Sequence, residues 1–437
     1  MIFRAQPTTT CRSQKNRQSV IALALSLAFA STGAFGLNYG IYDARALALG
    51  GTAVALGSAQ NAQFYNPALL ATYEGREDFT KNGRFYFPSI VAQGSDNISE
   101  TQDILDRDAD TRMTDAVTAF NANPSATNAG QVLDAATYLQ QAITDLGNRD
   151  LNVDAFFGLS VSEPSDHAGG AFYAGTRIVG VGNSNIDPAD VALLNDYIEA
   201  MQFVSSGGTS GTAHPELLDA NGALINPNGT IQSSAAVSSL AISEWGLSMA
   251  KEFWFGPVPI SFGVTPKLMR VDVYSKDISY GDTSIDYQDE KRSYTTANVD
   301  VGMLIPIGEH FRVGVAAKDL IPTTFQTANG SDVKFKSRSR FGAAYTSHFV
   351  DIGVDVDMQK NDSVTGGTPL QEASIGMELR PFRWIDFRLG YRQDMEGLRG
   401  GVSSGGLKLK FGPFITELAY AVGDNVQGGG LQFGWAF

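Results

Sequence analysis

One short motif in this sequence has the spacing of a catalytic nucleophile. Residues 401–405, with the sequence GVSSG, match the pattern G-x-S-x-G, in which a serine acts from a sharp turn between a strand and a helix. Here the motif opens an expected strand within a glycine-rich stretch, so the context that such a serine needs is missing. Ser403 is therefore not expected to act as a nucleophile, and we predict that the chain is not an enzyme.

Residues that could hold a metal ion or a redox group are few. The four histidines are scattered along the chain, mostly at expected turns: His167, His214, His310 and His348. A metal site needs several ligands that converge, and this spacing indicates none. The single cysteine, Cys11, lies in the expected export signal, so the mature chain would contain no thiol for disulfide exchange or thiolate ligation. We predict no cofactor and no metal.

Charged side chains recur instead at every second position. From Ser293 onward the sequence alternates between apolar and charged residues, as where Ile352 and Val354 alternate with Asp351 and Asp355. Since side chains of a strand point alternately to its two faces, each strand has one apolar face and one charged face. A soluble β-sandwich would also produce this alternation. The alternation alone does not decide the fold class.

The connections between the strands decide in favour of a transmembrane barrel. Very short turns, such as 306–310 and 412–413, alternate with longer polar loops, such as 321–333, 361–369 and 424–428. Short periplasmic turns and long outer loops are typical of up-and-down barrels, whose even strand number places both termini in the periplasm. We predict an all-β, antiparallel barrel. Its fourteen expected strands are 82–94, 151–163, 168–182, 236–252, 258–275, 293–305, 310–319, 334–346, 349–360, 370–380, 384–394, 402–411, 414–423 and 429–437.

Two insertions interrupt the strand rhythm on the long-loop side, at 95–150 and 183–235. The spacing of their apolar residues predicts helices over 101–120, 129–146 and 188–203. These helices could form an extracellular lid, or they could pack onto the barrel rim without a further role. The sequence leaves both interpretations open.

The N-terminal residues 1–36 are typical of a cleaved signal peptide. Basic residues precede the apolar run 19–29, and small residues follow it up to Gly36. The run is too short for a transmembrane helix. Without residues 1–36 the chain has 28 Lys and Arg against 46 Asp and Glu. We therefore expect export to the Gram-negative outer membrane and no direct binding of nucleic acid.

The last expected strand carries a separate signal. Four apolar residues alternate along it and share one face: Leu431, Phe433, Trp435 and the terminal Phe437. Such a strand, ending in Phe at the carboxylate, is similar to the signal that directs outer-membrane barrels to the barrel-assembly machinery. We predict this role for these four residues, with outer-membrane lipids as the surroundings of the assembled barrel.

The segment after the signal peptide contains a small-residue run with Gly50 and Gly51, followed by Asn66-Pro67-Ala68. Residues 43–71 thereby resemble the N-terminal hatch of FadL-like outer-membrane barrels, the long-chain fatty-acid transporter type. Together with AAKDLIPTTF at 316–325, they are most similar to the TraF-type family named for conjugal transfer. The resemblance implies a plug over 37–81, built on these five residues, inside a barrel over 82–437.

The resemblance also implies a function. FadL-like barrels admit hydrophobic small molecules, so we expect this chain to bind or pass such ligands. Five inward cations are candidate ligand-binding residues: Arg312, Arg388, Arg392, Lys408 and Lys410. Alternatively, each of these cations pairs with a lumenal carboxylate, for which the candidates are Asp300, Asp355, Glu378, Asp386 and Glu417. A second functional hypothesis, implied by the family name, is a non-transport envelope component associated with the conjugation apparatus.

Overall fold

The computed structural model describes residues 37–72, 83–96, 108–147, 151–279, 290–328, 330, 332–361, 370–397 and 399–437. Within these residues, fourteen antiparallel strands form one closed barrel, in which β1 pairs with both β2 and β16. The predicted fold class and strand number are confirmed. The expected signal peptide, 1–36, lies outside the described residues.

The barrel strands follow one another around the wall. Their bounds are β1 Arg84–Gly94, β2 Leu151–Glu163, β3 Ala168–Asn185, β4 Ser234–Phe255, β5 Val258–Ser279, β6 Lys291–Ile307, β7 Phe311–Lys318, β10 Arg338–Thr346, β11 Val350–Asp357, β12 Glu372–Phe382, β13 Ile385–Asp394, β14 Val402–Phe411, β15 Phe414–Gly423 and β16 Val426–Ala436. A separate hairpin, β8 Thr323–Gln326 with β9 Asp332–Phe335, lies between β7 and β10.

Two expected connections differ from the structure. The loop expected at 424–428 is a tight turn, because β15 and β16 pair up to Gly423 and Val426, and Asn425 adopts a positive φ of 59°. The strand expected over 334–346 is divided, because its first residues belong to β9 and β10 begins only at Arg338. The strands that flank the other expected long loops join them at the end of the barrel opposite the short turns.

The outer wall of the barrel is apolar and is edged by aromatic side chains. Leu389 and Leu418 are exposed on the outer face, whereas the charged residues between the outward positions point inward. Exposed aromatic residues gather where the strands meet the short turns: Phe255, Phe311, Phe349, Phe382, Trp384, Phe411, Phe414 and Trp435. An apolar band bordered by an aromatic girdle is the outer surface of a transmembrane barrel. None of the helices in the described residues is long and apolar enough to cross a membrane.

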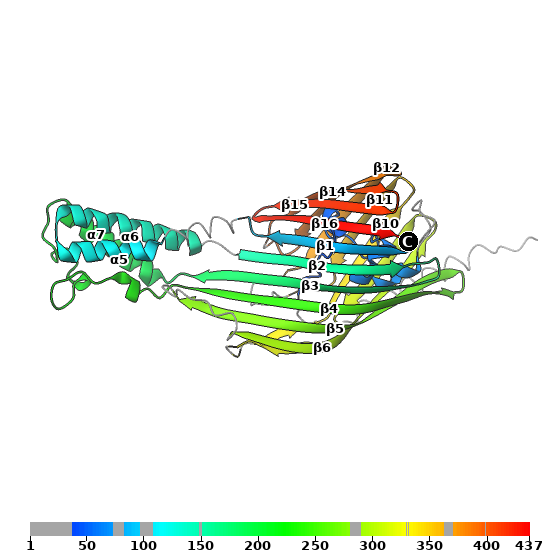
Figure 1. Ribbon diagram of the computed structural model, residues 1–437, viewed down its shortest axis with the longest axis horizontal. Helices are drawn as coiled ribbons and strands as arrows, with labels where there is room; N and C mark the ends of the chain where they lie inside the picture. The colour runs from blue at the N-terminus through cyan, green and yellow to red at the C-terminus, as the bar shows by residue number, and fades with distance from the viewer. Residues whose placement is uncertain are drawn as a thin grey trace, which may run out of the picture.

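The wall has very uneven height. β4 and β5 have 22 residues each, whereas β7 and β11 have 8. A transmembrane strand needs about 9–11 residues, so the long strands extend well beyond a bilayer on the long-loop side. Figure 1 shows these strands reaching toward a group of helices at one end of the molecule.

The helices of the two insertions form a separate head. Its helices are α5 Ala109–Ala122, α6 Ala126–Gly147 and α7 Pro188–Ser205. Phe120, Leu139 and Tyr197 belong to a buried core within the head. Figure 1 shows the head standing beyond the strand ends, away from the barrel mouth. It is therefore neither a lid over the lumen nor a layer packed on the barrel rim.

The N-terminal segment fills the lumen. It contains α2 Ala44–Ala48, η1 Ala59–Asn61, α3 Ala62–Tyr65 and η2 Pro67–Ala71. All residues of these elements except Ala59 are buried. We refer to residues 37–72 below as the plug.

Candidate functional site in the plugged lumen

The first helix of the plug is closed at both ends by local chemistry. The Asp43 carboxylate caps α2 by accepting the Ala46 N–H at 2.9 Å. After α2, Gly50 and Gly51 have positive φ angles of 68° and 90°, which favour glycine. A Cβ atom at Gly50 would also lie 2.8 Å from the Tyr391 backbone. These two glycines thus let the chain reverse directly against β13.

The Asn66-Pro67-Ala68 segment joins the plug to itself and to the wall. Asn66 Oδ1 accepts the Ala68 N–H at 3.1 Å, while its Nδ2 donates to Val54 O at 2.9 Å and to Met303 O at 3.2 Å. Pro67 begins η2, where a missing N–H costs nothing. The Asn66 side chain therefore connects two plug segments with β6.

Glycines in the strands make room for the plug backbone. At each of these positions a Cβ atom would overlap a plug atom; at Gly376, for example, it would lie 2.7 Å from Leu49 O. A glycine inside a strand commonly marks such a close approach of another backbone. The positions on the wall are Gly169, Gly263, Gly302, Gly342, Gly353, Gly376, Gly390 and Gly406. We call them the wall glycines.

Ionic and hydrogen-bonded contacts complete the attachment. Asp355 on β11 accepts the N–H groups of Ala53 and Val54 at 2.7 and 2.9 Å. From the plug, Arg45 Nε lies 2.9 Å from Glu378 Oε2 on β12. All five residues are buried. Glu378 is shared with two wall arginines, Arg388 at 2.8 Å and Arg380 at 2.6 Å, so Arg45 joins a charge cluster of the wall. The plug is therefore held by specific contacts as well as by its fit.

Two cavities lie on opposite sides of the plug. The cavity on the long-loop side has a volume of about 120 Å³, and its lining includes Leu37, Ile41, Arg340, Arg392 and Arg399. The cavity on the short-turn side has a volume of about 110 Å³ and is lined mainly by charged and small residues, among them Arg45, Arg312, Asp386, Lys408 and Lys410. We call the cavity on the long-loop side the outer chamber and the cavity on the short-turn side the inner chamber; the plug separates them.

The structure divides the five predicted cations among three places. Arg392 lines the outer chamber, whereas Arg312, Lys408 and Lys410 line the inner chamber. Arg388 is not among the described residues that line either chamber. It is buried between Glu378 at 2.8 Å and Glu417 at 2.7 Å. Alternation predicts which residues share a face but not their height along the lumen. Arg388 and Arg392 are four residue steps apart along β13, a distance of roughly 13 Å.

All five cations have polar or charged partners. Arg392 Nη2 donates to Gln93 Oε1 at 2.5 Å, and its Nε lies 3.7 Å from Glu372 Oε1. Lys408 and Lys410 lie 3.9 and 3.8 Å from Asp386 Oδ2. Arg312 donates to Gly57 O at 3.4 Å. Three of the five cations, Arg388, Lys408 and Lys410, have a carboxylate partner that the alternative interpretation expected. The Glu372 partner of Arg392 was not among those carboxylates, and Arg312 bonds to the plug.

The sequence analysis did not single out the remaining arginines of the outer chamber. Arg340 on β10 lies 2.5 Å from Asp357 Oδ1 and 3.2 Å from Glu372 Oε2. It faces inward with Arg338, two residues away, and this alternation in RSR was a usable signal. Arg399 lies in the loop between β13 and β14, where no periodicity could indicate that it faces the chamber.

Comparison with known proteins places the chain in a family. The family model described as "F plasmid transfer operon, TraF, protein" matches residues 63–357, more than half of the chain. The chain belongs to this TraF family. The matched region includes Asn66-Pro67-Ala68. Gly50, Gly51 and the C-terminal strands lie outside it. No curated protein matches the chain.

Solved barrels resemble this TraF-family chain at low sequence identity. The toluene transporter TodX of Pseudomonas putida is 11% identical, with a TM-score of 0.44, over 92% of this chain and 98% of TodX. A FadL homologue of Pseudomonas aeruginosa is 8% identical, with a TM-score of 0.45, over 92% of this chain and 98% of that protein. The fold assignment itself rests on the strand order of the chain described above.

The predicted assembly residues lie on the strand that closes the TraF-family barrel. Phe433 and Trp435 point outward from β16, and Trp435 lies edge-on to Phe414 with ring centroids 5.0 Å apart. Leu431 is half-buried, and the Phe437 N–H donates to Gly83 O at 3.1 Å. All four side chains occupy alternate positions beside β1 and β15.

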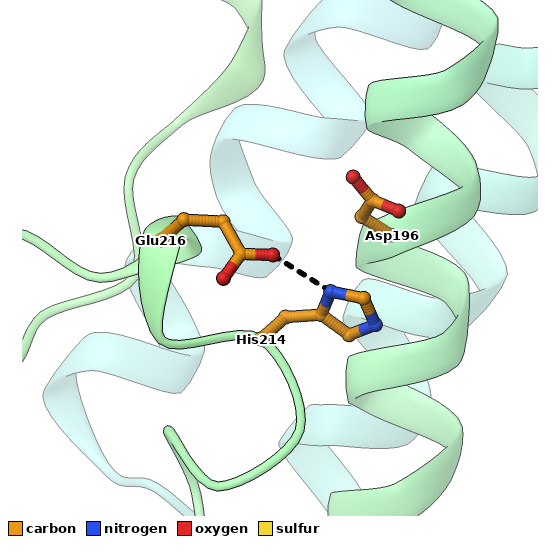
Figure 2. Close-up of side chains that lie close together, drawn as sticks. All are labelled: Asp196, His214 and Glu216. Carbon is orange, nitrogen blue, oxygen red and sulfur yellow. Dashed lines mark hydrogen bonds and ion pairs between the residues drawn. The ribbon is translucent and has the colours of Figure 1, made fainter.

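One histidine is less isolated than its sequence spacing suggested. In the head, His214 Nδ1 lies 2.8 Å from Glu216 Oε1, and Asp196 on α7 lies beside them (Figure 2). The hydrogen bond to Glu216 raises the pKa of His214. The sequence analysis missed this group because α7 and the segment after it meet only in the folded head.

Proposed function

We propose that this chain is an outer-membrane barrel that takes up a small amphipathic molecule, with an apolar body and an anionic group, into the outer chamber. The observation that carries the proposal is the lining of that chamber. It combines apolar side chains, such as Leu37, Val179 and Leu370, with the guanidinium groups of Arg340, Arg392 and Arg399. Ligand sites of this kind bury an apolar body and orient it through a few polar groups.

The plug supplies the gate in this proposal. A ligand in the outer chamber meets plug residues directly, because Leu37, Gly40 and Ile41 form part of the lining. Passage toward the inner chamber would require a shift of the plug or of the wall beside it. The buried contacts of Arg45 and Asp355 favour the closed arrangement until a bound ligand changes that balance.

The proposal includes a route to the membrane. Export through the segment 1–36 and assembly through Leu431, Phe433, Trp435 and Phe437 would insert the barrel in the Gram-negative outer membrane. The short turns would then face the periplasm, and the head would stand outside the cell. The proposed role is non-catalytic.

Binding by detergent-solubilised protein tests the chamber. We expect a labelled long-chain fatty acid to bind the intact protein, and the double variant Arg392→Gln/Arg399→Gln to bind it about tenfold or more weakly, because charge-assisted hydrogen bonds are lost. The affinity for a fatty alcohol of the same chain length should fall much less in the double variant. Lys410→Gln, in the inner chamber, is the control and should leave binding unchanged. If the intact protein binds neither compound, the uptake proposal is wrong.

Family membership favours a second candidate function, an envelope component associated with conjugal transfer. The head gives this role a physical basis, because it stands clear of the barrel and offers a surface to a partner. Donor cells that lack the head should then transfer DNA less often while keeping normal fatty-acid binding. Unchanged transfer would remove this candidate.

A further inference from the structure

The segment that builds the far side of the head has an unusual charge. Residues 186–233 contain six Asp and Glu and no Lys or Arg, and residues 108–147 add five acidic residues and one arginine. That arginine, Arg112, lies over the Tyr138 ring, with 4.7 Å between Cζ and the ring centroid. The carboxylates of residues 186–233 therefore have no cationic side chain from their own segment except His214.

Three of the six acidic residues of this segment have a structural role. Asp187 caps α7 by accepting the Ala189 N–H at 2.8 Å. Asp190 accepts the N–H groups of Gln232 and Ser233, and Asp219 accepts those of Asn221 and Ala223. These three carboxylates hold turns and the helix start, so the local fold accounts for them.

A second group of carboxylates has no such role and surrounds His214 instead. His214 Nδ1 lies 2.8 Å from Glu216 Oε1, and Nε2 lies 3.6 Å from Glu199 Oε2. One potential ligand atom each from Asp196, His214 and Glu216 lies within 4.8 Å of the others. Figure 2 shows the three side chains lying close together. Among the described residues, Asp196 accepts no hydrogen bond and forms no ion pair. Asp196 and Glu199 are three residues apart on α7 and so share a face.

We propose that Asp196, His214 and Glu216 form a surface site for one divalent transition-metal ion, with Zn²⁺ as the best match; Glu216 lies by Nδ1 of the imidazole, whereas Glu199 lies by Nε2 and is left out of the site. An imidazole nitrogen with carboxylate oxygens suits Zn²⁺, whereas Ca²⁺ and Mg²⁺ prefer oxygen ligands alone. Bond lengths of about 2.0–2.2 Å would place tetrahedral ligand atoms roughly 3.4 Å apart. The present separations need only rotamer changes of exposed or half-buried side chains to reach that value. The acidic surface of the head adds a favourable field for a cation.

Zinc titration of the full-length protein in detergent, after treatment with a chelator, tests this site. Calorimetry should give about one Zn²⁺ per chain, with affinity lowered about tenfold or more in His214→Ala and in Asp196→Asn. Asp134→Asn on α6 removes the same charge from the head without touching the group, so its affinity should match the intact protein. Circular dichroism before titration checks that each variant keeps its helices.

Three results would overturn the proposal. The first is the absence of Zn²⁺ binding by the intact protein. The second is an equal loss in Asp134→Asn and Asp196→Asn, which would indicate diffuse attraction by the acidic surface. The third is Ca²⁺ binding as tight as Zn²⁺ binding and insensitive to His214→Ala, which would indicate a carboxylate surface without a role for the imidazole.

Discussion

Single residues decide how closely the plug approaches the wall. Hydrogen bonds from Asn66 and to Asp355 need the plug backbone to lie directly on the strands, and the wall glycines provide the space. A methyl group at such a position would either displace the plug or shift the strand. Overpacking of this kind typically costs about 1–3 kcal/mol. The attachment of the plug is therefore sensitive to the smallest possible side chain.

Gly302→Ala should loosen the plug. The new Cβ atom would overlap Asn66 Oδ1, so Asn66 would lose its bond to Met303 O. Arg45 is the only Lys or Arg in residues 37–72, and it is buried in the intact protein. We expect trypsin to cleave after Arg45 faster in the variant, as followed by mass spectrometry.

Gly405→Ala is the matched control for this substitution. A Cβ atom there would meet its nearest neighbours at an ordinary 3.6 Å. Cleavage after Arg45 should stay slow in this variant. If both variants are cleaved equally, or neither is, the wall glycines do not control the fit of the plug.

Tyr197→Phe should change how the head responds to alkali. Tyr197 donates a hydrogen bond to Ile225 O at 2.5 Å, and burial raises its pKa to about 12. The unfolded chain releases this proton near pH 10, so the stabilisation is complete below pH 10 and is lost as the pH rises toward 12. The variant should lose about 1 kcal/mol at neutral pH.

Helix content followed by circular dichroism measures this difference. The intact head should lose stability relative to Tyr197→Phe between pH 10 and 12, so the two curves should converge. Parallel curves over that range would show that Tyr197 is not protected in the folded head.

At the scale of elements, alternation and loop length were enough to predict all fourteen barrel strands. Alternation is visible within each strand, because the bilayer requires an apolar outer face at every second residue, and loop length is visible directly beside it. The hairpin β8–β9 was missed, since its four-residue strands have too few residues to show a period. Phe325, Val333 and Phe335 pack in one cluster with Leu240 and Val271 of the long wall, and this contact is visible only in the folded protein.

The candidate site was less predictable than the strands. Which side chains meet at one level of the lumen depends on the register between neighbouring strands, as where Arg388 lies opposite Glu378. A sequence pattern within one strand does not contain that register. The plug segment was recognisable, but its contacts with the wall glycines come from eight positions distributed over most of the barrel. In the sequence, these glycines look like ordinary glycines within strands, and nothing in the pattern indicates that the plug contacts them.

Leu389→Arg should destabilise the barrel in a lipid bilayer. Leu389 is 58% exposed on the outer face and lies in the middle of β13. Arginine near the bilayer midplane costs about 2–4 kcal/mol, whereas near the interface it costs about 0–1 kcal/mol. Phe411→Arg, in the aromatic girdle, is the control and should cost much less. Refolding into vesicles at increasing urea gives both values, and equal costs would contradict the assigned outer face.

At the scale of the whole molecule, the acidic head stands beyond one end of the barrel (Figure 1), and inside the barrel the plug lies between the outer chamber and the inner chamber. The long strands β3 and β4, which α7 connects, place the head away from the bilayer, and the head has its own core. Substitutions in the head should therefore leave the barrel folded. Because of this separation, the proposed metal site in the head and the proposed ligand chamber in the lumen can be tested independently.

The central claim is that residues 37–72 close an otherwise complete barrel. The strands pair around the full circumference without the plug, and a closed barrel satisfies its own backbone hydrogen bonds. Conductance across a planar lipid bilayer tests the claim most directly. Intact protein should give no steady current, whereas protein that lacks residues 37–72 should insert and conduct steadily. A steady current of equal size through both proteins, or an inserted plug-less barrel that carries none, would contradict the account.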